Sequence, residues 1–298
     1  MRIAVVGAGQ ASAPHLQSIE DLSAQVTLAR LVARSAGKLA ALNLPANTAT
    51  STRLEDILED ASIAAVLVLT PPNTHLEIVA QLAQAGKHVL VEKPLDVSLA
   101  RAQQMVDICE QNGVKLAVML QHRMRDASLA LARLIQDGAL GQLLSASASI
   151  RWWRPQTYYN EPGRGTLARD GGGVLMTQAI HTLDLLLSLT GMPNRVMAMA
   201  GTSAVHQMEC EDTVAAGLPY PNGAIGSIDA TTAAWPGFAE RIALNFTGGS
   251  ATLEAGELRA ELSDGRTLQA GLRQATGSGA NPMAFDHAFH RAVLQDFV

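Results

Sequence analysis

The stretch Ile3-Ala4-Val5-Val6-Gly7-Ala8-Gly9-Gln10-Ala11-Ser12 decides the fold that we expect for this chain. A β-branched apolar run followed by glycines and small residues predicts a buried strand, a tight turn and the start of a helix. Glycines in such a turn let the backbone approach a pyrophosphate at the helix N-terminus. Ser12 stands where the pattern has its third glycine, and it is small enough for close packing. The stretch therefore predicts a dinucleotide-binding turn, with a plain strand–helix turn as the alternative.

Short apolar runs alternate with amphipathic stretches through the first part of the chain. The further runs that predict buried strands are 26–33, 64–69, 88–91 and 114–119. Gly86, Ser98 and Gly113 mark the ends of the helices predicted between them. Strand–helix repetition predicts right-handed crossovers and a doubly wound parallel sheet. Residues 1–122 are thus predicted to form an α/β Rossmann domain.

The second part, residues 123–298, has a different rhythm. Its strand-like runs are separated by turn residues, and Asn222-Gly223 and Asp264-Gly265 are hairpin signals. One strong helix is predicted over 174–190. We expect an α+β domain with a largely antiparallel or mixed open sheet, which binds substrate and forms the oligomer. An apolar stripe at helical spacing, from Phe285 to Phe297, is still in register at the last residue, which predicts that the natural chain continues.

Composition excludes several classes of protein. The 298 residues are 48% hydrophobic and 16% charged with a net charge of −5, so a compact protein is expected and nucleic acid is not an expected partner. The longest apolar run, 63–69, is far shorter than a bilayer span of ~20 residues, and no signal sequence precedes the first strand. We expect a cytoplasmic protein without membrane contact. Cys109 and Cys210 have no metal-ligand spacing, so neither a disulfide nor a metal site is predicted.

The end of the second predicted strand bears on the choice of cofactor. A carboxylate there would bind the adenosine ribose, but the chain reads Leu31-Val32-Ala33-Arg34-Ser35 without an acid. Arg34 and Ser35 suit a 2′-phosphate instead. We therefore predict NADP rather than NAD, although Arg34 as an ordinary solvated charge remains the alternative.

Aromatic residues gather after the strand that ends near residue 151. The segment Trp152-Trp153-Arg154-Pro155-Gln156-Thr157-Tyr158-Tyr159 holds four of the six Trp and Tyr residues of the chain. Aromatic faces stack on the apolar sides of sugar or cyclohexane rings, and Arg154 and Arg164 can bind hydroxyls or an anionic group. The segment predicts a substrate-binding wall, and an oligomer interface or the edge of the second core is the alternative.

Three further segments carry chemistry. Glu92-Lys93-Pro94 closes a strand at the carboxyl edge of the predicted sheet, where ligands of doubly wound folds bind, and its lysine is expected to be fixed and partly desolvated. Thr70-Pro71-Pro72-Asn73-Thr74-His75 follows the preceding apolar run, and Gly171-Gly172-Gly173-Val174-Leu175-Met176-Thr177-Gln178-Ala179-Ile180-His181 opens the predicted helix. Together with the glycine-rich turn, and in this order, these segments resemble the Gfo/Idh/MocA oxidoreductases over most of the chain.

The resemblance implies roles for individual residues. Lys93 corresponds to the catalytic lysine of the family and His181 to its catalytic histidine, and the Lys93–Pro94 bond is expected to be cis. Many relatives have an Asp four residues before the histidine, whereas this chain has Thr177. In an α-helix Thr177, His181 and Asp184 share one face, so Asp184 is a candidate for orienting the imidazole, as a third catalytic residue.

The expected activity is the transfer of a hydride between nicotinamide and a secondary alcohol, or its ketone, in a carbohydrate, cyclitol or alicyclic diol. A non-catalytic NADP-binding sensor or regulator of the same fold is the alternative, and an oligomeric scaffold a more distant one. We also expect a homodimer or homotetramer formed through the sheet of the second domain. The predicted cofactor-binding residues are Gly7, Gly9, Gln10, Ala11, Ser12, Arg34, Ser35, Thr70, Pro71, Asn73, His75, Glu92 and Lys93. The predicted substrate-binding residues are Gln121, Arg123, Trp153, Arg154, Tyr159, Arg164, Thr177 and His181.

Overall fold

The computed structural model describes residues 1–298 except 10, 46, 274–276 and 280–285. Its contacts divide the chain into two compact units. The first contains residues 1–119, 168–171 and 287–298, and the second contains residues 120–167 and 172–286. The end of the first run lies close to the predicted boundary at residue 122. The return of 168–171 and 287–298 to the first unit differs from the prediction, which gave both segments to the second domain.

The first unit is built on a six-stranded sheet in the order β3-β2-β1-β4-β5-β6. Every neighbouring pair in it is parallel. This is the expected doubly wound arrangement, in which strand order reverses beside β1. The strands are β1 Arg2–Val6, β2 Thr27–Val32, β3 Ala49–Ser51, β4 Ala65–Val68, β5 His88–Val91 and β6 Leu116–Val118.

Apolar runs form the central strands because helices cover both faces of a parallel sheet and leave no polar side to the strands. All four residues of β4 are fully buried. By contrast β3, which is not among the predicted strands, is half-buried or exposed and has no apolar run to signal it. The predicted ends of the other strands agree with the structure to within two residues.

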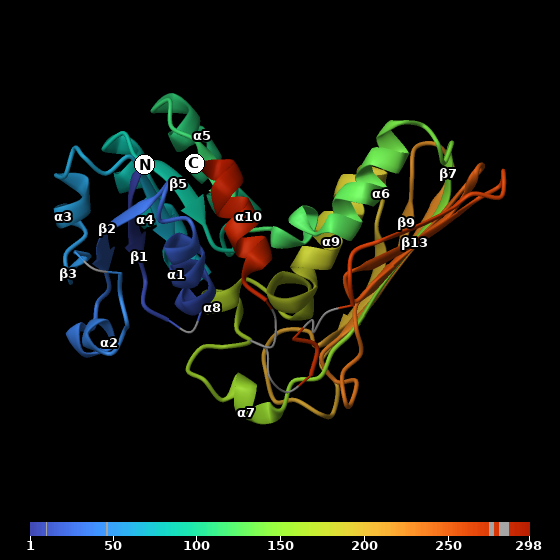
Figure 1. Cartoon of the computed structure of the whole chain (residues 1–298). Coiled ribbons are helices and arrows are strands. Elements are labelled where there is room, and N and C mark those ends of the chain that lie inside the picture. Colours follow the sequence, from blue (N-terminus) through green and yellow to red (C-terminus); the bar gives the residue numbers. More distant parts are fainter. Residues whose placement is uncertain (10, 46, 274–276, 280–285) are drawn as a thin grey trace. The chain divides into compact units, whose positions relative to one another are not determined.

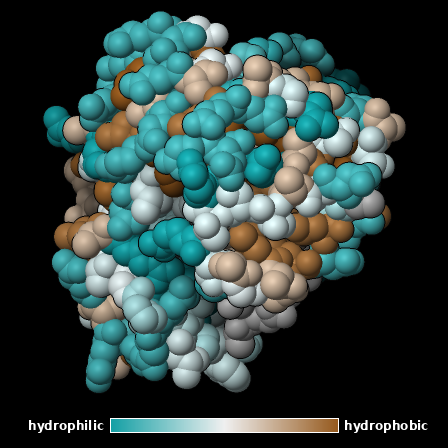
Figure 2. All heavy atoms as spheres, turned by 90° about the vertical axis from the view of Figure 1, so that its left-hand side faces the viewer, coloured by the Kyte–Doolittle hydropathy of each residue, from teal (hydrophilic) through white to brown (hydrophobic). Residues whose placement is uncertain are grey.

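Helices complete the first unit. They are α1 Ser12–Asp21, α2 Ala36–Ala40, α3 Glu55–Leu58, α4 His75–Gln84, α5 Leu99–Gln111 and α10 Ala288–Phe297. The Ser98 side chain accepts a hydrogen bond from the backbone N–H of Arg101 and so caps α5, as its position in the sequence predicts. The side of the unit that bears α2 and α3 is predominantly hydrophilic (Figure 2).

The last helix, α10, packs beside α1 (Figure 1). Two side chains near the start of α10 contact Asp21, the last residue of α1. The His287 Nε2 and Arg291 Nη1 atoms lie 2.8 and 2.9 Å from Asp21 Oδ2. These contacts, together with burial of Val293 and Leu294, attach the C-terminal segment to the first unit. Phe285, at the start of the predicted apolar stripe, lies outside the described residues.

The second unit is built on an eight-stranded sheet in the order β14-β13-β12-β11-β7-β10-β9-β8. All of its pairs are antiparallel except β7 with β10, so the predicted mixed, largely antiparallel sheet is confirmed. The predicted turns Asn222-Gly223 and Asp264-Gly265 join β9 to β10 and β13 to β14. The strands are β7 Leu143–Arg151, β8 Met197–Gly201, β9 Thr213–Pro219, β10 Ile225–Thr231, β11 Arg241–Phe246, β12 Gly249–Glu254, β13 Glu257–Leu262 and β14 Thr267–Ala270.

Among the described residues, the long helices of the second unit pack against one face of this sheet. These are α6 Asp126–Gln136 and α9 Ile180–Thr190, and the apolar core lies between them and the sheet (Figure 1). On the other face Met197 and Met199 of β8 and Ile225 of β10 are exposed. Their registry with Gly217, Ala215 and Pro219 of β9 places all three on one side of the sheet. We call these three residues, together with Ala215, Gly217 and Pro219, the open face.

The helix predicted over 174–190 is not regular throughout. Residues Leu175–Ala179 form a π-helical turn, and α9 follows it directly. Leu167–Thr190 forms a helical segment that is by length and composition apolar enough to cross a membrane. Of an 18-residue stretch within it, 56% is buried inside the protein, as in the core helix of a globular domain, so the segment is weak evidence for a membrane contact.

Candidate functional site

The glycine-rich turn connects β1 to α1 by close backbone packing. Gly7 has φ of +118°, and a Cβ atom there would lie 2.8 Å from the carbonyl oxygen of Leu69, so only glycine fits. Ser12, the first residue of α1, donates from its hydroxyl to the Gly9 carbonyl at 2.7 Å. A Cβ at Gly9 would meet no atom within 4 Å, so space is open there. An open backbone at the start of a ten-residue helix fits a pyrophosphate; Ala11 precedes that start, and Gln10 lies outside the described residues.

The predicted NADP-selecting pair follows β2 directly. Arg34 and Ser35 are both exposed. Ser35 is the N-cap of α2, and its hydroxyl accepts a hydrogen bond from the backbone N–H of Lys38 at 3.4 Å. An exposed guanidinium beside a short helix start is able to bind a phosphate, and the choice between NADP and NAD stays a prediction.

The loop after β4 is held by side-chain hydrogen bonds. Thr74 donates to the Pro71 carbonyl at 2.7 Å, and its Oγ1 lies 2.8 Å from that of Thr70. Thr70 and Pro71 are half-buried, whereas Asn73 is exposed.

His75 corrects one prediction. It was expected among the cofactor-binding residues, but its side chain is fully buried. Its ring nitrogens lie 3.0 Å from the Leu95 carbonyl oxygen and 2.8 Å from that of Thr70. Since the imidazole ties two loops together, it holds the loop in shape and does not face a ligand.

Glu92 fixes the backbone of Lys93 at the carboxyl end of β5. One oxygen of Glu92 lies 2.7 Å from Nε2 of the buried His15, and the other accepts the backbone N–H of Lys93 at 3.0 Å. Burial raises the pKa of Glu92, but the hydrogen bond with His15 and the charges of His15, Lys93 and His290 outweigh it and lower this pKa to about 2. The Lys93–Pro94 bond is cis, as the resemblance implies.

His290 of α10 completes a buried cluster with His15 and Glu92. Their ligand-type atoms lie within 4.8 Å of one another, and within the described ranges they are the residues that could hold a metal ion. The sequence predicts no metal here. The hydrogen bond between His15 and Glu92 accounts for two of the three groups without a metal, so that expectation is unchanged.

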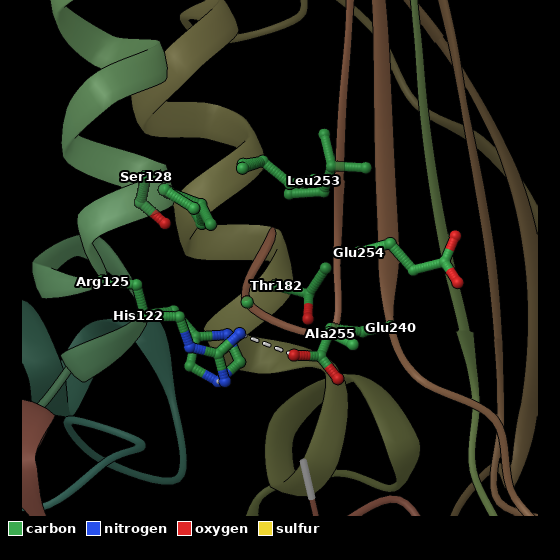
Figure 3. Close-up of a pocket in the computed structure, with 12 residues that line it drawn as sticks. His122, Arg125, Ser128, Thr182, Glu240, Leu253, Glu254 and Ala255 are labelled. Atoms are coloured by element: carbon green, nitrogen blue, oxygen red, sulfur yellow. Dashed lines mark hydrogen bonds and ion pairs between the residues drawn. The ribbon is translucent and has the colours of Figure 1, made fainter. Parts of the chain in front are cut away.

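His181 lies on the first turn of α9, directly after the π-helical turn. Its side chain is buried, and its ring centroid lies 4.9 Å from that of His122, with the ring planes tilted by 31°. The His122 Nε2 atom lies 2.8 Å from Arg125 Nη2, and Arg125 Nη1 donates to Glu240 Oε1 at 2.6 Å. His122, Arg125 and Glu240 line a pocket of the second unit together with Thr182, the residue after His181 (Figure 3).

Asp184 and Arg123, which were predicted in separate roles, form one ion pair. Nε and Nη2 of Arg123 donate to the two carboxylate oxygens at 2.7 and 2.5 Å, and these hydrogen bonds raise the pKa of Arg123. Both oxygens of Asp184 are therefore engaged by a guanidinium. Orientation of His181 by Asp184 stays a prediction.

Thr177 lies in the π-helical turn, and its hydroxyl donates to the Gly173 carbonyl at 2.7 Å. The α-helical spacing that would align it with His181 and Asp184 does not hold across a π-turn, because the turn contains an additional residue. The shared face thus extends from His181 to Asp184 only. The predicted alignment of Thr177 with these two residues is therefore wrong.

The predicted aromatic wall divides into buried and accessible residues. Arg154 is buried, and its guanidinium donates to the carbonyls of Trp153, Gly277 and Gly279 at 2.7–2.8 Å. Burial lowers the pKa of Arg154. The prediction that Arg154 contacts substrate is wrong, because its buried guanidinium is hydrogen-bonded to backbone carbonyls.

Tyr159 is buried as well, with its hydroxyl 2.8 Å from that of Thr232, and burial raises its pKa. It too is structural rather than ligand-facing. Tyr158 and Trp153 are half-buried, and Arg164 stacks over the Tyr158 ring at 4.3 Å while donating to its hydroxyl at 2.8 Å. The accessible part of the wall is therefore Trp153, Tyr158 and Arg164.

Other important residues carry no signal in the sequence. Glu211 accepts hydrogen bonds from the backbone N–H groups of Gly173 and Leu175 at 3.0 and 3.3 Å, and so anchors the start of the helical segment before His181. A Cβ at Gly173 would lie 1.7 Å from the Glu211 carbonyl oxygen, which explains this glycine of the motif. Arg125 and Glu240 are also missed, because their contact spans more than a hundred residues of sequence.

Comparison with known proteins matches both units. The model of the oxidoreductase family with an NAD-binding Rossmann fold matches residues 1–120, and the model of the GFO/IDH/MocA C-terminal domain matches residues 128–252. The chain belongs to the GFO/IDH/MocA oxidoreductase family. The predicted resemblance is confirmed, and with it the binding of a nicotinamide cofactor as a property of the family.

Individual relatives of this GFO/IDH/MocA chain act on cyclic polyols and sugars. It is 30% identical over 164 residues to scyllo-inositol 2-dehydrogenase (NADP(+)) of Bacillus subtilis, which covers 54% of this chain and 43% of that protein. It is 28% identical to 1,5-anhydro-D-fructose reductase of Ensifer adhaerens, over 74% of this chain and 63% of that protein. The chain spans about half the length of the first curated relatives that it matches.

A solved structure resembles the whole chain. The WlbA dehydrogenase of Bordetella pertussis, in complex with NADH and UDP-GlcNAcA, is 27% identical with a TM-score of 0.81. The match covers 100% of this chain and 84% of that one.

Proposed function

We propose that this chain is an NAD(P)-dependent dehydrogenase or reductase that transfers a hydride between nicotinamide and a secondary alcohol or its ketone. The observation that carries the proposal is the fixed position of Lys93. Glu92 holds the backbone of Lys93, and His15 holds Glu92, at the carboxyl end of a central parallel strand. Ligands of doubly wound sheets bind at that end of the strands.

The glycine-rich turn is where the cofactor would bind, since Gly9 and the start of α1 leave room for a pyrophosphate. Nicotinamide, when bound, accepts or donates the hydride. Arg34 and Ser35 support a preference for NADP. The inositol dehydrogenase relative is likewise named as an NADP(+) enzyme. The NADH complex of the WlbA relative shows that related proteins differ in this choice.

The protein itself moves a proton. During oxidation His181 takes the proton of the substrate hydroxyl, while the ammonium of Lys93 hydrogen-bonds the same oxygen and stabilises its developing negative charge. The reverse reaction returns that proton from His181 to the oxygen. The same two groups are also able to exchange these roles, because both protonation states depend on their surroundings.

The substrate class follows from the relatives and from the accessible wall. Inositol, anhydrofructose and a nucleotide-linked aminosugar acid all occur in the names of relatives. Trp153 and Tyr158 offer faces for a carbohydrate, cyclitol or alicyclic diol ring, and Arg164 offers donors to a hydroxyl or an anionic group. We further propose that the protein is cytoplasmic and binds neither nucleic acid nor membranes.

A panel of inositols, anhydrosugars, UDP-linked uronic acids and alicyclic diols, each with NADP and with NAD, tests the proposal. Formation or consumption of the reduced cofactor is followed by absorbance. Turnover of at least one ring alcohol or ketone that disappears in Lys93→Met supports the proposal. Cofactor binding without turnover of any compound would favour the second candidate below.

That second candidate is a non-catalytic NADP-binding sensor or regulator. It is favoured by Thr177, which replaces the acid of the family pattern and hydrogen-bonds its own helix backbone. The presence of both Lys93 and His181 argues against a sensor, because a protein that only binds NADP does not need these two acid–base groups.

A further inference from the structure

We propose that His122 is a positioning residue for His181, held neutral in the tautomer that carries its proton on Nδ1 by Arg125 and Glu240. The inference deepens the proposed function and rests on it, because His181 acts there as the acid–base group. The two contacts of His122 that carry the inference lie within the second unit. They join the 3-10 turn Gln121–Met124 to Arg125, next to α6, and to His181 of α9.

The tautomer follows from the chemistry of arginine. A guanidinium carries five N–H donors and no acceptor, and it stays protonated in proteins. The 2.8 Å contact between Arg125 Nη2 and His122 Nε2 is therefore a hydrogen bond donated by arginine. A ring nitrogen that accepts has a lone pair and no proton. While this contact lasts, a neutral His122 must carry its proton on Nδ1.

Glu240 keeps Arg125 in place. The side chain of Arg125 is 13% exposed and that of Glu240 is 6% exposed, and their 2.6 Å contact forms a buried ion pair. The second oxygen of Glu240 and the hydroxyl of Thr182 have no hydrogen-bond partner among the described residues, and both side chains line the pocket of Figure 3. Arg125 is thus the cation that balances Glu240, and it cannot turn away from His122 without leaving a buried carboxylate unpaired.

The charged groups around His122 favour its neutral form. Arg125 faces it from the start of α6, Glu240 lies behind Arg125 just before β11, and His181 faces it from α9. The Arg123–Asp184 pair joins the same turn to α9, and Glu254 of β12 borders the pocket. The nearest of these charges is the guanidinium, and a like charge beside an imidazole disfavours protonation.

A neutral His122 serves His181 in two ways. Its ring, 4.9 Å away and tilted by 31°, fixes the orientation of the His181 ring by contact. It also allows His181 to accept a proton without facing a second imidazolium, since two cations at this distance would repel. The Arg125–Glu240 pair therefore acts on the reaction only through His122.

The test uses the whole chain labelled with 15N-histidine and long-range nitrogen–proton correlation spectra. His122→Phe assigns the resonances of His122. In the wild-type chain, Nδ1 of His122 is expected to carry the proton and Nε2 none, and this pattern should persist as the pH falls through the ordinary histidine range near ~6.5. Arg125→Met/Glu240→Gln removes both charges without leaving a carboxylate unpaired, and His122 should then titrate in that range. The matched control is Arg151→Met, which breaks the exposed Arg151–Asp229 pair of the same unit and should change nothing at His122.

Two spectroscopic results would overturn the inference. One is a proton on Nε2 of His122 in the wild-type chain, and the other is the same titration of His122 with and without Arg125. With an identified substrate, the double variant should lower kcat about tenfold and leave the Kd of the cofactor unchanged, and an unchanged kcat would also count against it. The spectra need no substrate. A chain with the expected tautomer but no turnover would therefore contradict the proposed function and leave the tautomer intact.

Discussion

Arg34 is the residue on which the choice of cofactor depends. It is exposed, and it follows β2 where an acid would otherwise bind the ribose of NAD. A charge-assisted hydrogen bond to the 2′-phosphate is worth roughly 1.5–3 kcal/mol. Arg34→Ala should therefore weaken NADP by about tenfold or more and leave NAD nearly unchanged, as measured by calorimetry. Equal losses for both cofactors would remove Arg34 from the phosphate site.

Lys93 and His181 are expected to act on the substrate oxygen and not on the cofactor. Lys93→Met and His181→Ala should each remove most of the turnover, on the order of a hundredfold or more, because each removes a proton-transfer or charge-stabilising group. Fluorescence titration of the cofactor should give nearly the wild-type Kd for both variants. Normal turnover in Lys93→Met would mean that the family mechanism does not apply to this chain.

At the scale of elements, a substitution in the glycine-rich turn should affect cofactor binding without affecting the stability of the fold. Gly9→Ala should change the free energy of unfolding of the cofactor-free chain by less than about 1 kcal/mol, since a Cβ there meets no atom within 4 Å. The added methyl group would occupy the open backbone, so the Kd of the cofactor should rise about tenfold or more.

Gly7→Ala is the matched comparison in the same turn. It should destabilise the chain by about 2 kcal/mol or more, because of its φ of +118° and the Leu69 carbonyl oxygen 2.8 Å from the new atom. Tight cofactor binding by Gly9→Ala would show that the turn does not approach a pyrophosphate.

The docking of α10 should depend on pH. Burial, followed by the charge of His15, lowers the pKa of His290 to about 4, below the value of 6.5 for an ordinary histidine. The unfolded chain then binds more protons between these values, so the contribution of His290 is fully present above pH ~6.5 and is lost as the pH falls through ~4. The pKa of Glu92 is also lowered, to about 2, so protonation of Glu92 causes a further loss of stability at still lower pH.

Urea unfolding of the wild-type chain and of His290→Leu at about pH 7 and about pH 5 measures this effect. The wild-type chain should lose on the order of 1 kcal/mol more than the variant between the two conditions, because leucine does not titrate. The same loss in both proteins would mean that His290 takes up its proton without cost in the folded state.

At the scale of the whole molecule, the open face of the eight-stranded sheet predicts an oligomer. Met197, Met199 and Ile225 are 59%, 77% and 69% exposed on one side of strands β8 and β10, which flank β9. Apolar side chains gathered in this way indicate an interaction surface, here for a second copy of the chain. Sedimentation should show a dimer or tetramer, and Ile225→Asp should shift it toward monomer while circular dichroism stays unchanged.

The control for this experiment is Leu99→Asp in α5 of the first unit. Leu99 is 85% exposed, but it belongs to the first unit and is not part of the open face, so the assembly should be unaffected. A wild-type chain that sediments as a monomer at all concentrations would rule out the proposed assembly.

The sequence by itself determined the features that depend on neighbours along the chain. Apolar runs become the buried strands β1, β4 and β5, because burial on both faces requires continuous hydrophobicity. Asn222-Gly223 makes a hairpin because its glycine adopts a positive φ at no cost. The motifs around Lys93 and His181 identify the family because they are local and occur in a fixed order.

The tertiary structure alone decided which polar side chains remain accessible. Arg154, His75 and Tyr159 are residue types common at ligand sites, yet backbone carbonyls or a hydroxyl from other segments of the chain engage their polar atoms. Arg123 pairs with Asp184, and Arg125 contacts His122 and Glu240. No local sequence pattern indicates these contacts. The reason is physical: periodicity predicts the face of an element that is buried, whereas a hydrogen bond depends on the three-dimensional positions of both partners.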